Sequence, residues 1–383
     1  MMINMEAAKN LALYIHIPFC VKKCLYCDFL SFTGNANTYE HYVNQLLHET
    51  DEWSKKEFLK EYLVKTIFIG GGTPSAIPQE YIAKILCKLQ ETFIIDKNAE
   101  ITIECNPGTV TEDKLRTYYV NGINRLSFGL QSTDNIELNR LGRIHTFEQF
   151  EENFYLARKV GFQNINIDLM SAIPGQTCES LLRSLKTVTA LNPEHVSVYG
   201  LIIEEGTPFY EMYQNDMSSF PDEDMDREMY RLTNKLLKEA GYHHYEISNY
   251  AKPGLECRHN LTYWQRGEYL GLGLGAASLL QNKRFTNATD IDTYNSYNID
   301  FDTVPELTDQ ECIEETMFLG LRTDTGVNLK LFEKKFGKTV DSFFPGVEER
   351  MIKEGLIKKI DKSIVLTEKG IDISNYVMGQ FIF

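Results

Sequence analysis

Two patterns of apolar and polar positions, one typical of strands and one typical of helices, follow each other in turn along the first half of the chain. Short runs rich in β-branched residues each lead into a Gly, Pro or Asn turn and then into a stretch with helical spacing. The short runs are Leu11–Ile17, Thr66–Ile69, Glu100–Glu104, Asn124–Leu130, Asn164–Leu169 and His195–Leu201, and the helical stretches are Tyr39–Lys60, Gln79–Thr92, Glu112–Asn121, Phe147–Val160 and Cys178–Ala190. Strands that alternate with helices indicate a parallel sheet. Six such units predict an α/β fold with a partial (β/α)6 or complete barrel, and an open doubly wound sheet is the competing architecture.

The pattern changes after residue 202. A polar loop over Asn215–Asp226, a helix over Met225–Ala240, a β-like run over His243–Tyr250, a glycine-rich stretch over Gly267–Gly275 and a polar connector over Gln281–Asp302 follow in turn. The last part predicts three helices and a small hairpin, at Asp309–Leu321, Leu329–Phe336, Gly346–Glu354, Leu356–Ile360 and Ser363–Leu366. This order is typical of a winged-helix-like module. We therefore divide the chain into a barrel over 1–225, an extension over 226–302 and a C-terminal domain over 303–383.

Composition narrows the class of protein. The 383 residues can bury a large core and a smaller one, and the formal net charge of −15 argues against nucleic acid as a partner. No apolar run reaches the roughly 18–20 residues of a membrane span, and the segment 1–10 has no signal-peptide pattern. We expect a cytoplasmic protein with no transmembrane segment, for which peripheral membrane contact through a partner stays open.

Three of the eight cysteines, Cys20, Cys24 and Cys27, are crowded into eight positions. Pro18 ends the first predicted strand, so the cysteines lie on the loop at the active-site end of the barrel. In a long cytosolic chain such a cluster favours metal binding over disulfides. Three thiolates suit a 4Fe–4S cluster that keeps one iron free for another ligand. A zinc site completed by His16 or Asp28 is the alternative.

Glycines and polar residues stand where the other predicted strands end. The turn Gly70-Gly71-Gly72-Thr73-Pro74 follows the second run, Glu104 and Gln131 end the third and fourth, and Asp168 lies near the end of the fifth. In a barrel these positions meet at one mouth. Each residue alone also suits an ordinary turn or cap.

The motif Cys-x3-Cys-x2-Cys with an aromatic residue before the third cysteine resembles the radical S-adenosylmethionine (SAM) signature. The flanking Tyr14–Cys20 run is similar to the oxygen-independent coproporphyrinogen III oxidase branch, and the resemblance continues to about Gly275, with a weaker C-terminal match. The resemblance implies that the glycine turn receives the amino group of SAM and that Arg143 meets its carboxylate. The residues that it assigns to SAM are Tyr14, Tyr26, Gly71, Gly72, Thr73, Glu104, Gln131, Arg143 and Asp168.

Two departures from the oxidases point to the haem chaperones of the same branch. The oxidases carry a fourth cysteine two residues after the third, where this chain has Phe29. The chaperones carry His-Asn-x-x-Tyr-Trp, which is present here after Cys257 as His259, Asn260, Tyr263 and Trp264. An imidazole or thiolate is a good axial ligand for haem iron, and aromatic rings can lie on a porphyrin face. A structural loop histidine beside core aromatics is the alternative for this motif.

These observations predict a haem chaperone that binds haem, holds a 4Fe–4S cluster with SAM, and passes haem to acceptor proteins. A further glycine-rich segment resembles one that often ends Gly-Ala-His-Ser in the family, but Ala277 stands in place of the histidine. The runner-up is a radical enzyme that decarboxylates coproporphyrinogen III, so enzymatic activity is left open. A zinc-stabilised protein-interaction module is the third candidate, and a homodimer stays open.

Overall fold

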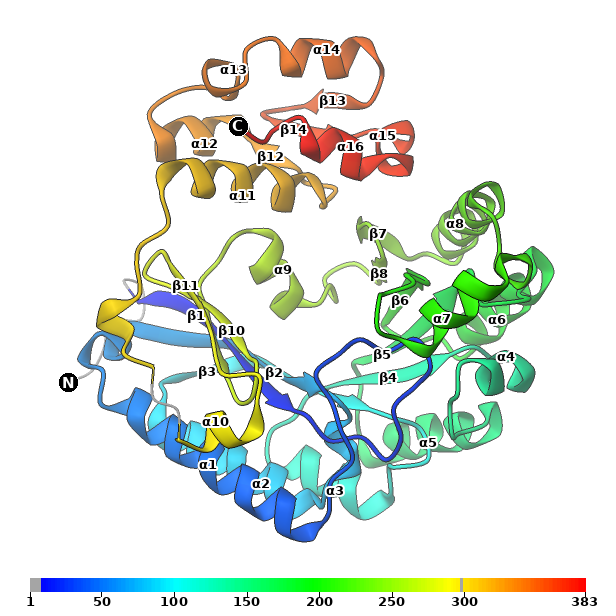
Figure 1. Cartoon of the computed structure of the whole chain (residues 1–383), viewed down its shortest axis with the longest axis vertical. Coiled ribbons are helices and arrows are strands. Elements are labelled where there is room, and N and C mark those ends of the chain that lie inside the picture. The colour runs from blue at the N-terminus through cyan, green and yellow to red at the C-terminus, as the bar shows by residue number, and fades with distance from the viewer. Residues whose placement is uncertain (1–7, 297–298) are drawn as a thin grey trace.

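The computed structural model describes residues 8–296 and 299–383, so the start of the segment 1–10 and two residues of the polar connector lie outside it. Six parallel strands follow one another in chain order across the main sheet: β1 (Lys9–Ile17), β2 (Tyr62–Gly71), β3 (Ile95–Cys105), β4 (Arg125–Gln131), β5 (Ile165–Ser171) and β6 (His195–Gly200). An open doubly wound sheet would reverse its strand order part-way. The uninterrupted order and the curved sheet in Figure 1 confirm the partial (β/α)6 barrel.

Helices cover the outer face of this curved sheet (Figure 1). They are α1 (Ala36–Ser54), α2 (Gln79–Thr92), α3 (Glu112–Val120), the short α4 (Asn135–Arg140), α5 (Phe147–Val160) and α6 (Cys178–Ala190). In α2 the buried residues Ile82, Ile85 and Leu89 recur at helical spacing, which turns one apolar stripe toward the sheet. Thr146 and Gln149 form a capping box that starts α5.

Short strands extend both edges of the parallel core. On one side β9 (Tyr269–Leu272) pairs parallel to β1, followed by antiparallel β10 (Ala277–Leu280) and β11 (Lys283–Thr286). On the other side β8 (Asn249–Ala251) and β7 (His243–Glu246) pair antiparallel beyond β6. The helices of this region are α7 (Pro208–Asn215), α8 (Glu223–Glu239) and α10 (Ile291–Ser296). The polar connector predicted over 281–302 therefore contains β11 and α10.

The C-terminal module has its own apolar core around Met317, Phe332 and Ile364. Its elements are α11 (Asp309–Leu321), β12 (Val327–Asn328), α12 (Leu329–Phe336), α13 (Val340–Phe343), α14 (Val347–Lys353), β13 (Ile357–Ile360), β14 (Ser363–Leu366), α15 (Glu368–Asp372) and α16 (Ser374–Gly379). Helices followed by a hairpin match the predicted order. The module faces the open side of the barrel, and α9 (Arg258–Trp264) lies inside the curve of the sheet between the two (Figure 1).

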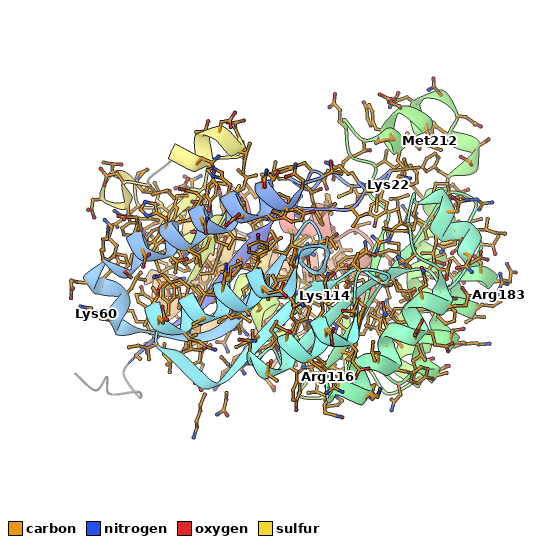
Figure 2. The ribbon with its side chains drawn as sticks, turned by 90° about the horizontal axis from the view of Figure 1, so that it is seen from below. Lys22, Lys60, Lys114, Arg116, Arg183 and Met212 are labelled. Atoms are coloured by element: carbon orange, nitrogen blue, oxygen red, sulfur yellow. The ribbon has the colours of Figure 1, made fainter. Side chains whose placement is uncertain are left out.

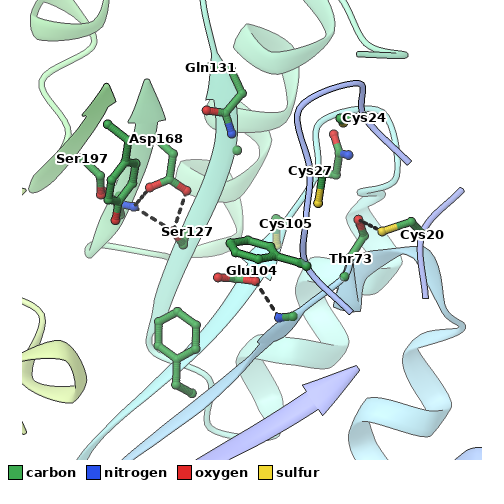
Figure 3. Close-up of a pocket in the computed structure, with 18 of the residues that line it drawn as sticks. Cys20, Cys24, Cys27, Thr73, Glu104, Cys105, Ser127, Gln131, Asp168 and Ser197 are labelled. Carbon is green, nitrogen blue, oxygen red and sulfur yellow. Dashed lines mark hydrogen bonds between the residues drawn. The ribbon is translucent and has the colours of Figure 1, made fainter. Parts of the chain in front are cut away.

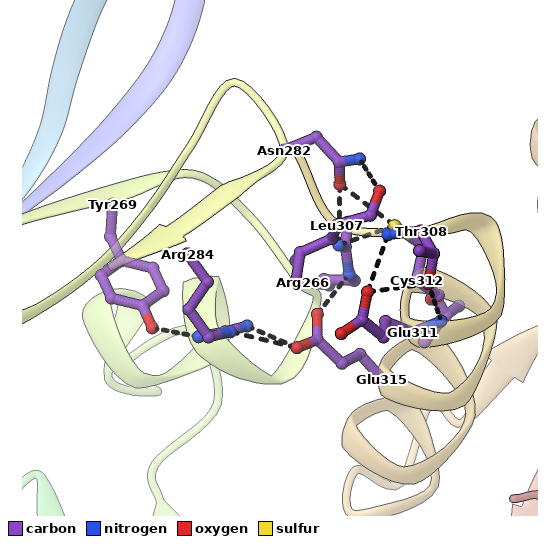
Figure 4. A network of polar contacts seen from close by, with 10 residues as sticks. Arg266, Tyr269, Asn282, Arg284, Leu307, Thr308, Glu311, Cys312 and Glu315 are labelled. Carbon is purple, nitrogen blue, oxygen red and sulfur yellow. Dashed lines mark hydrogen bonds and ion pairs between the residues drawn. The ribbon is translucent and has the colours of Figure 1, made fainter. Parts of the chain in front are cut away.

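Polar contacts fix the C-terminal module to both edges of the open barrel. Glu315 on α11 accepts from Arg266 at 2.7 Å and from Arg284 on β11 at 2.8 Å (Figure 4). At the opposite edge, His243 on β7 lies 2.7 Å from Asp324, just after α11. The module thus bridges the two edges that the incomplete barrel leaves apart. Among the described residues, no helix has both the length and the apolar character needed to cross a membrane.

Candidate cluster and cofactor site

A cavity of about 460 Å³ occupies the inside of the curved sheet. That volume lies in the usual range for a site that takes one small molecule or cofactor. The cysteine loop lines one end, and α9 lines the other with His259, Asn260 and Tyr263. Lys22 and Phe29 on the loop are exposed, whereas His259 is 1% exposed, so the mouth lies at the cysteine end.

The three cysteine thiols face this cavity from the loop after β1, and none is in a disulfide (Figure 3). Cys20 Sγ lies 3.4 Å from Thr73 Oγ1, and Cys24 Sγ accepts from Arg143 Nη1 at 3.5 Å. Among the described residues, no three His, Cys, Asp or Glu side chains converge closely enough to hold a single metal ion. Three free thiols on one loop are the donor set of a 4Fe–4S cluster that keeps one iron open to another ligand.

His16 and Asp28, the candidate fourth zinc ligands, do not complete such a site. His16 is 7% exposed, and its ring nitrogens lie 3.0 Å from the Tyr14 hydroxyl and 2.9 Å from the Leu30 carbonyl. Both nitrogens are therefore engaged within the protein. Asp28 is exposed on the loop. His16 has a structural role at the base of the cysteine loop.

The glycine turn after β2 lies directly against the cysteine loop. Gly72 N donates to Ile17 O at 2.9 Å and Thr73 N donates to Phe19 O at 2.8 Å. Gly71 has φ of 111°, and a Cβ there would lie 2.5 Å from the His16 ring. Only glycine combines that left-handed backbone with such a close approach. The turn therefore brings backbone to the cavity edge beside the cluster cysteines.

Carboxylates from β3 and β5 line the cavity beyond this turn (Figure 3). Glu104 accepts from Gly71 N at 3.0 Å, and burial together with the nearby Asp168 raises the pKa of Glu104 to about 8. Asp168 accepts from Ser127 at 3.1 Å and from Asn166 at 2.7 Å. Hydrogen bonding thus holds both carboxylates in place on the cavity wall.

Gln131 and Arg143 also line the cavity, and each has one energetically unfavourable feature. Gln131 ends β4 with φ of 74°, a left-handed conformation that is uncommon for a non-glycine residue. Arg143 donates through Nη2 to Asn106 Oδ1 at 2.9 Å and to the Gly129 carbonyl, while its buried Nε has no partner among the described residues. The structure therefore gathers the cysteines, the glycine turn, Tyr14, Tyr26, Arg143 and the three strand-end residues predicted for SAM around one cavity.

The motif after Cys257 is a helix, not the loop considered as its alternative. His259 Nδ1 lies 2.8 Å from Thr66 Oγ1, and its Nε2 lies 2.8 Å from the Tyr263 hydroxyl. Burial and the charge of Arg125 lower the pKa of His259 to about 3, which keeps the imidazole neutral. His259, Asn260 and Tyr263 line the cavity. Any ligand that reaches His259 Nε2 must displace the Tyr263 hydroxyl.

Cys257 and Trp264 lie outside the cavity wall. Cys257 is fully buried with its Sγ 3.7 Å from Glu100 Oε1. Trp264 packs beneath the Arg322 guanidinium, which lies 4.4 Å from the ring centroid, and this cation–π contact ties α9 to the C-terminal module. Of the five residues predicted for haem, three therefore face the cavity and two anchor the helix that presents them.

Sequence reasoning missed the polar residues deep in the cavity, which include Arg125, Ser127, Asn166, His195 and Ser197. The signal was present: Arg125-Leu-Ser127-Phe-Gly129 and His195-Val-Ser197-Val alternate polar and apolar residues. In a strand this alternation places polar side chains on one face. The apolar face packs under the outer helices, so the polar face lines the cavity.

Comparisons with known proteins agree with this geometry. The model described as "Radical SAM superfamily" matches residues 14–188, and the model described as "HemN C-terminal domain" matches residues 307–373. A Bacillus subtilis protein named heme chaperone HemW is 37% identical over 374 residues, which cover 96% of this chain and 98% of that protein. The chain belongs to the HemW family of radical SAM proteins. The HemW of Escherichia coli is 41% identical over 267 residues, 70% of this chain and 69% of that one.

This chain shares its fold with a coproporphyrinogen III oxidase. The solved structure of that enzyme, HemN from Escherichia coli, superposes with a TM-score of 0.85 over 98% of this chain and 90% of that chain, at 24% identity. At this identity the likeness establishes the fold. Radical SAM membership implies a 4Fe–4S cluster and SAM, and the three free thiols beside the glycine turn are a donor set that fits them.

Proposed function

We propose that this protein is a haem chaperone, which binds haem, holds a 4Fe–4S cluster with SAM, and passes haem to acceptor proteins. Similarity to HemW proteins along nearly the whole chain carries the proposal. The His-Asn-x-x-Tyr-Trp motif supports it, because the fold turns three of its residues into the same cavity as the cysteines. Phe29, 63% exposed where the oxidases carry their fourth cysteine, argues against coproporphyrinogen decarboxylation.

In this proposal Cys20, Cys24 and Cys27 hold the cluster. When bound, the cluster and SAM supply one-electron chemistry at the sulfonium of SAM. The chain's own residues position the pair. The glycine turn offers close backbone, and Arg143, which already donates toward Cys24, offers a guanidinium to a carboxylate.

His259 is the proposed haem ligand. Its neutral imidazole needs no deprotonation, and the bond from Nδ1 to Thr66 orients the ring. Nε2 exchanges the Tyr263 hydroxyl for iron when haem binds. The Phe68 ring stacks 5.1 Å from the His259 ring and makes that wall apolar, as a porphyrin face requires.

A haem titration of the anaerobically prepared holoprotein tests the proposal. Wild type should give a sharp Soret band, and His259→Ala should weaken haem affinity roughly tenfold or more through loss of an axial bond. Tyr263→Phe removes the hydroxyl that competes for Nε2 and should bind haem at least as tightly as wild type. His41→Ala, at an exposed histidine on α1, is the matched control.

Two outcomes would redirect the proposal. An unchanged band in His259→Ala would remove His259 as the ligand. Accumulation of protoporphyrinogen from coproporphyrinogen under anaerobic, reducing conditions with SAM would make the protein an oxidase.

A further inference from the structure

One cationic side chain in the cavity has no direct hydrogen-bond or ion-pair partner among the described residues. Arg125 on β4 is 2% exposed and lines the deep part of the cavity. Within residues 8–296 and 299–383 its guanidinium makes no hydrogen bond and no ion pair, and its buried Nε has no partner. A buried guanidinium without a partner is expensive, and native proteins nearly always pair it.

The acidic groups near Arg125 are already engaged elsewhere. Glu100 accepts from the backbone N–H groups of Arg258 and His259, both at 3.1 Å, and so caps the start of α9. Asp168 accepts from Ser127 and Asn166. These carboxylates contribute a favourable field at Arg125, but neither makes a direct contact with it.

The polar surroundings of Arg125 are built rather than incidental. His195 bridges Asn166 at 2.6 Å and the Tyr245 hydroxyl at 2.7 Å, which fixes both groups on the wall beside it. Thr102, the register partner of Arg125 on β3, also buries a hydroxyl that has no partner among the described residues. A barrel interior is ordinarily filled by branched apolar side chains. Here Arg125 and Thr102 instead bury hydrogen-bonding groups that have no partner among the described residues.

We propose that the deep end of the cavity is an anion-binding subsite in which Arg125 takes a carboxylate of the ligand. The carboxylate chemistry follows from the guanidinium, whose planar pair of N–H donors matches two carboxylate oxygens. If the proposed haem function holds, the carboxylate is a propionate of the tetrapyrrole. The amino-acid end of SAM is the less suitable source, because Arg143 and the glycine turn face it at the opposite end of the cavity.

The first arm of the test does not depend on haem. The holoprotein is melted with propionate or with propionamide, which has the same shape without the charge, at matched ionic strength. Propionate should raise the melting temperature of wild type more than propionamide does, because a ligand of the native state stabilises it. Arg125→Gln should lose that difference, whereas Arg183→Gln, an exposed arginine on the outer helix α6 (Figure 2), should keep it.

The melting temperature without added ligand separates this subsite from a structural role. Removing the guanidinium takes away both the cost of its burial and the favourable field from Glu100 and Asp168, so Arg125→Gln should melt close to wild type. A lower melting temperature for Arg125→Gln, or an equal response of both proteins to propionate, would overturn the subsite. Arg125→Lys, which keeps the charge, should keep part of the response.

The second arm identifies the source of the carboxylate. Wild type should bind haem roughly tenfold or more tightly than haem dimethyl ester, and Arg125→Gln should bind the two equally. An equal haem-to-ester ratio in wild type, with the propionate response intact, would keep the subsite and exclude the haem propionate. Failure of wild type to bind either tetrapyrrole would refute the haem function while the first arm still decides the subsite.

Discussion

Gly72 is the position where one added methyl group should uncouple the cysteine loop from the barrel. A Cβ there would lie 2.8 Å from the Phe19 carbonyl oxygen, 2.9 Å from Pro18 C and 3.0 Å from the Ile17 oxygen. All three atoms are backbone, so no side chain can rotate away. Ordinary contact begins near 3.4 Å, and Gly72→Ala must therefore separate the two segments by about 0.6 Å. Overpacking of this kind costs about 1–3 kcal/mol, which lowers the melting temperature of a chain this long by about 1–4 °C.

The sharper effect should be on the cluster, because Cys20 directly follows Phe19. We expect Gly72→Ala to lose most of its iron and to bind SAM more weakly, measured by iron and sulfide analysis and by equilibrium binding on anaerobically prepared protein. Gly379→Ala is the matched control, since a Cβ at that end of α16 meets no atom within 4 Å. Wild-type iron content and SAM affinity in Gly72→Ala would refute the proposed link between the turn and the cluster.

Two further predictions concern stability. Glu315→Ala should lower the free energy of unfolding in denaturant by about 3 kcal/mol, because it leaves the Arg266 guanidinium, 8% exposed, without its carboxylate. Glu57→Ala, which removes an exposed ion pair with Lys60, is the control and should lower it by at most about 1 kcal/mol. Equal losses in the two variants would contradict this prediction. Burial and the charge of Arg143 lower the pKa of His145 from 6.5 to about 3. The unfolded chain therefore binds this proton first, and the free energy of unfolding should fall as pH drops from 6.5 toward 3, by up to about 1.4 kcal/mol per pH unit. His145→Gln should flatten that slope, and an unchanged slope would rule out His145 as its source.

The parallel core was predictable because each strand is a short run rich in β-branched residues that leads into a Gly, Pro or Asn turn. The run Asn124–Leu130 predicted β4, which spans Arg125–Gln131, and Pro18 correctly placed the end of β1 at Ile17. The edge strands were harder, since β10 and β11 have four residues each, which is too short for an alternating pattern to stand out. Helix α9 has seven residues, too few for a helical period to emerge, so its motif was considered as a loop.

The residues at the cysteine end of the cavity could be predicted from sequence, because the carboxyl ends of the strands in a barrel lie close together. Glu104, Gln131 and Asp168 could be placed at one mouth without any knowledge of side-chain contacts. The residues at the deep, α9 end of the cavity could not be predicted. The alternation of polar and apolar residues in β4 or β6 shows that one face of the strand is polar, but not whether that face points into the barrel. Only the closing curvature of the sheet decides that Arg125 and His195 point inward rather than to solvent.

The residues predicted for SAM and three of the five predicted for haem line a single cavity. Its volume of about 460 Å³ matches one cofactor-sized ligand, and its exposed mouth lies on the cysteine side. The other side is closed by α9, which Trp264 and Arg322 fasten to the C-terminal module, while Glu315 holds that module to the β11 edge. If haem binds at His259 as proposed and SAM binds beside the cluster cysteines, the two ligands must share this volume. The Trp264–Arg322 contact joins the α9 wall of the cavity to the C-terminal module, so an outward shift of α9 would break this contact unless the module shifted with it.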